Sequence, residues 1–158
     1  MELCWSALTF APSDESVQVL IDSWGWLLKE PYRPVLFSVL GDVFFESSSG
    51  GIYWLNTGTG EVMRVAATVD EFRALLGTDS ASEWFLPQLV EELHGSGKIP
   101  GDDQCYSYAV LPIFQEGKYE VANLNVVPAR EHFALTAHIH REIRELPDGA
   151  KVQLKVGP

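Results

Sequence analysis

Cysteine and basic residues are scarce in this chain of 158 residues, and long apolar runs are missing. The two cysteines, Cys4 and Cys105, stand outside any CxxC pair, so they indicate neither a disulfide framework nor a cysteine-rich metal site. No stretch approaches the roughly 20 uninterrupted apolar residues of a transmembrane helix. The first twelve residues have no basic residue ahead of their short apolar run, unlike a secretory signal. We therefore expect a cytoplasmic protein with two free thiols.

Negative charge dominates the composition. The chain has 22 Asp and Glu against 11 Lys and Arg, a net charge of −11. Such a protein repels nucleic acid and anionic membranes and attracts basic protein surfaces. Neither nucleic acid nor membrane is therefore an expected partner. Solubility alone is the other explanation of this acidity.

Hydrophobic spacing and turn residues predict helices around a group of short strands. Helical spacing occurs in the segments 14–28, 69–76, 80–94 and 128–146. Strand-like runs occupy 35–39, 43–46, 52–55, 61–65, 105–111, 121–127 and 152–156. Pro87 should interrupt the third helix or delay its start. The first four strands are too close together for parallel crossovers, so we expect an antiparallel meander.

The predicted fold class is α+β, with the antiparallel meander packed against several helices. At 158 residues and 46% apolar composition, the chain can bury one core of its own. We expect one domain over residues 1–158, in which residues 1–33 form a helical lead-in and residues 34–158 form the core.

The last predicted helix carries three histidines, the residues from which a metal or catalytic site would be built. At about 100° per residue, His132 falls on the apolar face, His140 on its flank and His138 on the charged side, so they cannot converge on one ion. The apolar residues of this face are Phe133, Leu135, Ile139, Ile143 and Leu146. We expect His132 to be a hydrogen-bonded core residue and His138 to be exposed.

Motifs for nucleophilic or phosphate chemistry are missing as well. The sequence contains no GxSxG and no GxxxxGK[ST]; Ser47–Ser49 is typical of a hairpin tip and Asn56–Gly60 of a tight turn. The adjacent carboxylates Glu91-Glu92 and Asp102-Asp103 do not by themselves form an acid–base pair. We therefore predict no catalytic residue, no metal and no cofactor, and a protein that is not an enzyme.

Aromatic residues occur as adjacent pairs on the predicted strands, as in Phe44-Phe45 and Tyr53-Trp54. Neighbours on a strand face opposite sides of a sheet, so one residue of each pair points away from the main core. We expect a second layer of helices to cover that side. The alternative is an exposed aromatic patch, which is typical of protein interfaces.

A series of short patterns resembles one family of bacterial immunity proteins. The patterns are Leu40–Phe45, Trp54–Glu61, Glu83–Pro87, Gln104–Tyr108, His132-Phe133, Ile139-His140 and Leu146–Gly149. Together they are similar to the C-terminal domain type of the Tdi immunity proteins of type VI secretion, which neutralise Tde-type DNase effectors. The resemblance runs from about Trp24 to Val156. It implies a fold signature rather than an interface, so no binding residue is transferred from the family.

Resemblance and acidity together predict a cognate immunity protein that blocks an antibacterial toxin non-covalently. A nuclease has a basic active-site cleft for DNA, and an acidic inhibitor can associate with it rapidly. The candidate toxin-binding residues are the loop carboxylates Asp102, Asp103, Glu116 and Glu120. The two pairs lie at opposite ends of one predicted strand, so they form one patch only if the chain folds back. Charge reversal at Asp102 and Asp103 should slow association with little effect on thermal stability.

Two questions stay open at the level of sequence. The alternative function is a small-molecule-binding or regulatory module in which the aromatic strands line a ligand pocket. The oligomeric state is not indicated by any pattern in the chain.

Overall fold

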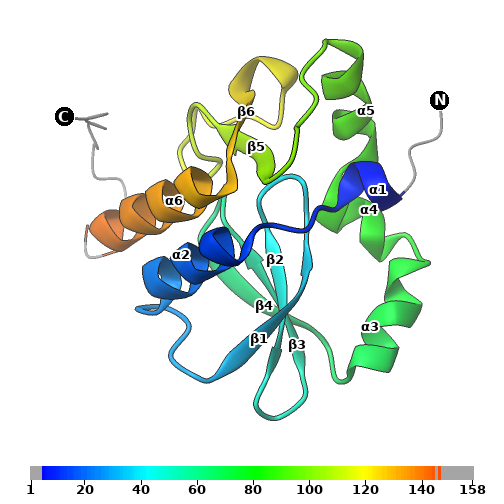
Figure 1. Cartoon of the computed structure of the whole chain (residues 1–158), viewed down its shortest axis with the longest axis vertical. Coiled ribbons are helices and arrows are strands. Elements are labelled where there is room, and N and C mark those ends of the chain that lie inside the picture. The colour runs from blue at the N-terminus through cyan, green and yellow to red at the C-terminus, as the bar shows by residue number, and fades with distance from the viewer. Residues whose placement is uncertain (1–4, 145, 147–158) are drawn as a thin grey trace.

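A computed structural model of the chain describes residues 5–144 and Leu146 (Figure 1). The backbone forms a four-stranded antiparallel sheet and a two-stranded antiparallel sheet with helices packed around them, so the predicted α+β class is confirmed. Cys4 and the predicted strand at 152–156 lie outside the described residues. Within the described part of the chain, no helix is long and apolar enough to cross a membrane.

The four-stranded sheet is the predicted meander. Its strands are β1 (Tyr32–Phe37), β2 (Val43–Ser47), β3 (Ile52–Asn56) and β4 (Glu61–Ala66), paired in chain order. Across β2 and β3, Phe44 lies opposite Trp54 and Phe45 opposite Tyr53. The Ser47–Gly51 segment turns β2 into β3, as expected of a hairpin tip, and a Ser47 N–H to Gly51 carbonyl bond of 2.9 Å closes it.

Helices cover both faces of the meander (Figure 1). On one face, α2 (Asp14–Trp24) and α6 (Ala129–Ile143) lie side by side and bury Phe45. On the other face lie α3 (Val69–Leu76), α4 (Ser80–Phe85) and α5 (Pro87–Gly95). There the ring of Phe44 contacts Phe72, Trp84 and Phe85, with centroids 5.0–5.6 Å apart. The prediction that helices cover the second side of the sheet is confirmed.

The third predicted helix is two helices with a break at Pro87. Proline has no N–H and disfavours the right-handed helical region for the residue before it. Leu86 accordingly adopts a left-handed backbone, with φ of +44°, between α4 and α5. The first long helix is also shorter than predicted, because α2 ends at Trp24 and Gly25 caps it.

The two-stranded sheet consists of β5 (Gln104–Tyr108) and β6 (Leu124–Pro128). A short 3-10 helix, η1 (Val121–Asn123), takes the first part of the segment predicted as the second strand. β5 ends before Val110, whose N–H and carbonyl both bond to the Asn123 side chain. The Tyr106 N–H donates to the Val39 carbonyl at 2.8 Å, which ties this sheet to the meander. A short helix not predicted from the sequence, α1 (Trp5–Leu8), packs Trp5 edge-on against Phe85.

The buried face of α6 is narrower than the sequence predicts. Phe133 is fully buried, but the side chains of Leu135 and Leu146 are 49% and 43% exposed. The remaining buried positions of the helix are small or polar: Ala129, His132, Thr136, Ala137 and His140. Small side chains allow the helix axis to come close to the meander, and polar ones allow it to bond to the turns of the sheet.

Candidate functional site

Two histidines of α6 hold the Asn56–Gly60 turn between β3 and β4. His132 Nε2 lies 2.9 Å from Thr57 Oγ1, and His140 Nε2 donates to the Thr57 carbonyl oxygen at 2.8 Å. The two histidines are about two helical turns apart, so both reach the same turn. Their side chains are only 1% and 4% exposed. The prediction that His132 is a hydrogen-bonded core residue is confirmed, and His138 is exposed as predicted. His140, predicted at the flank of the apolar face, is buried.

Glycine permits this close approach at two turns. Gly41 and Gly60 have φ values of +88° and +77°, in the left-handed region that glycine adopts without penalty. A Cβ on Gly41 would lie 2.0 Å from His132 Nε2, and one on Gly60 would lie 2.7 Å from His140 Nδ1. Both glycines belong to the patterns that resemble the immunity family, and their role here is structural.

A chain of hydrogen bonds runs from β5 through α6 to the turn before β2. Ser107 Oγ lies 2.7 Å from His132 Nδ1, and Thr57 Oγ1 lies 3.1 Å from Asp42 Oδ1. A neutral His132 with its proton on Nε2 fits these contacts: Ser107 donates to Nδ1, and the Nε2–H lies between Thr57 Oγ1 and the Gly41 carbonyl oxygen, 3.2 Å away. The Thr57 hydroxyl in turn donates to Asp42. Burial lowers the pKa of His132 to about 4, which keeps the ring neutral. The hydrogen-bond chain therefore ends on the Asp42 carboxylate.

Asp42 is a buried carboxylate that has no counter-ion among the described residues. Its Oδ1 also accepts the Thr57 N–H at 3.0 Å, and its Oδ2 accepts the Trp54 indole N–H at 3.2 Å. Burial raises the pKa of Asp42 to about 7, although the hydrogen bonds from Thr57 and Trp54 act in the opposite direction. A carboxylate has about four acceptor positions, and three are used here. One position on Oδ2 therefore remains available to a further donor.

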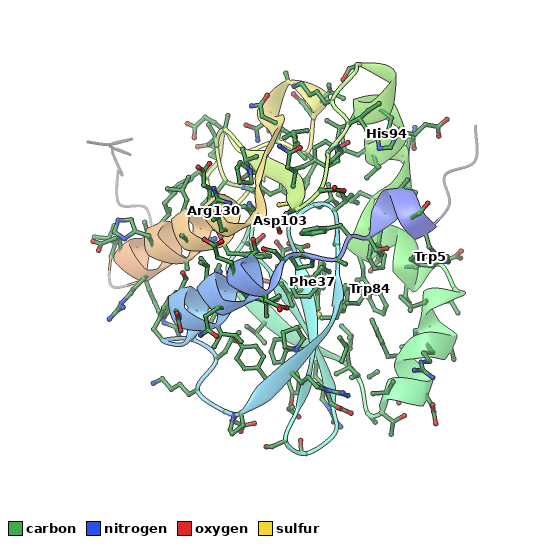
Figure 2. The ribbon with its side chains drawn as sticks, in the orientation of Figure 1. Trp5, Phe37, Trp84, His94, Asp103 and Arg130 are labelled. Carbon is green, nitrogen blue, oxygen red and sulfur yellow. The ribbon has the colours of Figure 1, made fainter. Side chains whose placement is uncertain are left out.

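Asp42 lines a pocket of about 270 Å³ between the meander and the α4–α5 break. The other lining residues are Leu40, Trp54, Asn56, Glu83, Trp84, Leu86, Tyr108 and Tyr119. Four aromatic rings and two carboxylates thus surround the cavity, and none of the described residues that line it is basic. Figure 2 shows Trp84 on the side of the sheet covered by α3–α5. We call this cavity the Asp42 pocket.

Two further hollows lie near the chain segment that joins α2 to β1. Their volumes are about 180 and 320 Å³, and both are lined by Lys29, Glu30 and Tyr32. Because each contains one basic and one acidic side chain, neither has a preference for one sign of charge. The Asp42 pocket, with two carboxylates among aromatic rings, is the better candidate for recognition.

The four carboxylates predicted to bind a toxin lie outside this pocket. Asp102, Glu116 and Glu120 are exposed. The register of β5 with β6 places Gln104 and Tyr108 at opposite ends of the strand pair. Asp102 precedes one end and Glu120 lies near the other, so these two carboxylates do not form one patch. Glu120 directly follows Tyr119, a residue that lines the pocket.

Asp103 has a structural role at the start of α2. Its carboxylate accepts the Ser13 N–H and the Ser13 and Ser16 hydroxyls at 2.8–2.9 Å. Burial alone would raise the pKa of Asp103, but these bonds and the nearby charge of Arg130 lower it overall. Figure 2 shows Asp103 and Arg130 near the starts of α2 and α6. Charge reversal at Asp103 would remove the anchor of α2, so for this residue we now expect a loss of stability instead of the small effect predicted from the sequence.

Sequence reasoning missed Asp42, Glu83, Tyr108 and Tyr119 as members of one site. Asp42 sits in a turn pattern, Leu40-Gly41-Asp42, that looks like ordinary turn chemistry. One signal could have identified Asp42. The residues on both sides of it in the sequence are apolar, and an Asp in such a segment is expected to be buried with it. Among the described residues, no group of three or more His, Cys, Asp or Glu could hold a metal ion. Cys105 is free and buried, and burial raises the pKa of its thiol.

Comparison with known families gives a match over slightly less than half of the chain. Residues 66–140 match the family described as T6SS immunity protein Tdi1, C-terminal. This match confirms the resemblance drawn from the sequence over residues 66–140; the patterns at Leu40–Phe45, Trp54–Glu61 and Leu146–Gly149 lie outside it. No curated protein matches the chain.

The Tdi1 C-terminal match begins at the last residue of β4 and ends within α6. It includes His132 and His140 but not the strands and turns of the meander that bond to them. Thr57 and Gly41, the partners of these histidines, belong to that meander. The matched segment therefore completes its buried hydrogen bonds only with the help of residues that precede it.

Proposed function

We propose that this protein is an immunity protein that binds a toxin of type VI secretion and blocks it without covalent chemistry. The family match over residues 66–140 carries this proposal. The net charge of −11 supports it, because an acidic inhibitor is attracted to a basic surface. A nuclease of the Tde type is the target we propose, since such an enzyme must hold DNA in a cationic cleft.

The proposed site of action is the cytoplasm, where a DNase would meet its substrate. The proposed unit is one domain over residues 1–158, because α6 bonds to the turns of the meander and cannot pack independently of it. The exposed Asp102, Glu116 and Glu120 are proposed to attract the toxin at long range. Asp103 contributes charge there as well, but its carboxylate is already bound to Ser13 and Ser16.

An immunity gene should lie beside the gene of its toxin, so the test is inhibition of the toxin encoded by a neighbouring gene. Purified toxin should degrade plasmid DNA, and one equivalent of this protein should abolish the degradation. Co-expression should also restore growth of cells that carry the toxin. An unrelated protein of similar net charge serves as the control, since it should not inhibit. Full toxin activity in the presence of excess protein would contradict the proposal.

A second candidate function is binding of a small molecule in the Asp42 pocket, and its four aromatic rings favour that option. The volume of about 270 Å³ lies just below the roughly 300–1,000 Å³ of most ligand pockets, so only a small ligand fits. Native mass spectrometry of the protein purified from its own cells separates the two functions. A stoichiometric added mass together with no toxin inhibition would favour the ligand module.

A further inference from the structure

We propose that the Asp42 pocket receives an arginine side chain from the surface of the bound toxin. This inference rests on the proposed immunity function and assigns it a specific contact. The pocket supplies three things that a guanidinium group requires: aromatic faces, negative charge and a free hydrogen-bond acceptor.

The aromatic walls are held in place before any ligand arrives. Trp54 stacks on Phe44 with centroids 6.2 Å apart, and Trp84 packs against Phe44 and Phe72. Tyr108 and Tyr119 meet edge to face, with centroids 5.9 Å apart and planes at 90°. Rings fixed in this way lose little conformational entropy when a cation stacks on them, which favours binding. A guanidinium is planar and weakly hydrated, so it stacks on such rings better than an ammonium does.

The pocket holds negative charge from Glu83 and from the ionised form of Asp42, and no described basic side chain pairs with it. Asp42 lies inside it and Glu83 is exposed among its lining residues. In the described part of the chain, neither carboxylate forms an ion pair with a lysine or arginine. An uncompensated buried carboxylate is unfavourable, so a cation that enters from outside removes that penalty. Entry of a cation also favours the ionised form of Asp42. Because the pKa of Asp42 is about 7, the carboxyl group can lose its proton at neutral pH when the cation binds.

The occupant is a side chain of a basic partner rather than a second copy of this protein. Two copies, each with a net charge of −11, repel each other. Apolar Leu40 and Leu86 beside the rings suit the methylene stem of an arginine, whose charged end can then reach Oδ2 of Asp42. Charge complementarity therefore points to the cationic face of the toxin.

The first test measures the dissociation constant for the toxin with two exposed pocket variants. Glu83→Lys reverses a charge in the pocket, and Tyr119→Ala removes a ring that is 44% exposed, so neither change should disturb the core. Each variant should raise the dissociation constant about tenfold or more, as for an interface hot spot. The matched control is Glu92→Lys, which makes the same charge change on exposed α5 outside the pocket and should change affinity less than about threefold.

The second test uses ethylguanidinium chloride as a probe, without the toxin. It should shift the indole N–H resonances of Trp54 and Trp84 in the full-length protein, while those of Trp5, Trp24 and Trp26 serve as internal references. Ethylammonium chloride at the same concentration should produce smaller shifts, because it does not stack. Equal shifts at all five indoles, or equal effects of the two cations, would overturn the arginine assignment.

The outcomes separate this inference from the proposed function. If the wild-type protein does not bind the toxin, the immunity proposal fails, and the ethylguanidinium titration still judges the pocket. If the wild-type protein binds and both pocket variants bind equally well, the immunity proposal stands and the arginine contact is wrong. Weakening by Glu92→Lys as strong as that by Glu83→Lys would attribute the effect to net charge and also overturn the inference.

Discussion

At the scale of single residues, buried polar side chains are the feature that distinguishes this core. Asp42, Thr57, Ser107 and His132 are each less than 10% exposed, yet every one has a hydrogen-bond partner. A buried polar group that loses its partner costs the full desolvation penalty, so such a network is sensitive to any change in one member. The sequence identified His132 as a core histidine but not the residues to which it bonds.

We predict that His132→Lys destabilises the protein by about 3–5 kcal/mol, because it buries a charge with no partner. The matched change His138→Lys, on the exposed side of the same helix, should alter the free energy of unfolding by no more than about 0.5 kcal/mol. Urea denaturation at neutral pH measures both. Similar stabilities of the two variants would show that the register of α6 is wrong.

The two titrating groups of the network should oppose each other in the dependence of stability on pH. Burial raises the pKa of Asp42 from 3.8 to about 7, so its contribution to stability is lost as pH rises through that range. Burial lowers the pKa of His132 from 6.5 to about 4, so its contribution is lost as pH falls through nearly the same range. The lowered pKa of His140 acts in the same direction as that of His132. The wild-type protein should therefore show a shallow pH profile.

Single substitutions should expose the two opposite slopes. In His132→Gln, the free energy of unfolding should fall as pH rises from about 4 to 7, by at most about 4 kcal/mol at 1.36 kcal/mol per unit of pKa shift. In Asp42→Asn it should rise with pH over the same range. Denaturant titrations at four pH values measure the slopes, which do not depend on the absolute stability of each variant. Slopes of the same sign in both variants would contradict the assignment of the charges.

At the scale of elements, the packing of α6 against two turns of the meander organises the fold. The turn before β2 and the turn between β3 and β4 are held by His132 and His140 through Thr57 and Gly41. Both turns lie so close to the helix that a methyl group added to Gly41 or Gly60 would overlap a histidine ring of α6. The spacing of glycines in the sequence indicated tight turns, but not that the turns face a helix.

We predict that Gly41→Ala is far more destabilising than Gly50→Ala. Both glycines have φ near +90°, so each substitution carries the same backbone strain of about 1 kcal/mol. A Cβ on Gly50 meets nothing within 4 Å, whereas one on Gly41 overlaps the buried ring of His132. Overpacking of this kind adds about 1–3 kcal/mol or more. Thermal denaturation of the two variants measures the difference, and equal melting temperatures would contradict the predicted contact.

At the scale of the whole molecule, net charge is the property most directly tied to the proposed function. A net charge of −11 can serve solubility, recognition of a basic partner, or both, and an experiment can separate the two roles. Association rates are suited to this because long-range attraction acts before contact and is screened by salt.

We predict that reversing Asp102, Glu116 and Glu120 together to lysine slows association with the toxin and makes the rate less dependent on salt. All three are exposed, so stability should change little; Asp103 is left intact because it anchors α2. The comparison is with an equal number of reversals at Asp14, Glu15 and Asp22. Stopped-flow measurements at low and high salt give the rates. If the two triple variants behave alike, net charge rather than position governs association.

The meander, most helix positions and the acidity could be predicted from the amino-acid pattern alone. Turns a few residues apart leave antiparallel hairpins as the only way to connect the strands, and helical periodicity is local, so both are legible in the chain. The interruption at Pro87 was also predicted, because proline has no N–H. The end of the first long helix was not, because Gly25 caps α2 four residues before the periodic pattern stops.

The surroundings of Asp42 could not be predicted, because they depend on how distant segments pack together. The residues of its pocket come from the turn before β2, from β3, from α4 and the α4–α5 break, from the end of β5 and from the segment before η1, and no local pattern relates them. Burial and hydrogen bonding between residues as far apart as Gly41 and His132 depend on how helices and sheet pack in three dimensions. The charge of an aspartate in a turn is visible in the sequence, but its enclosure by four aromatic rings is a consequence of the fold.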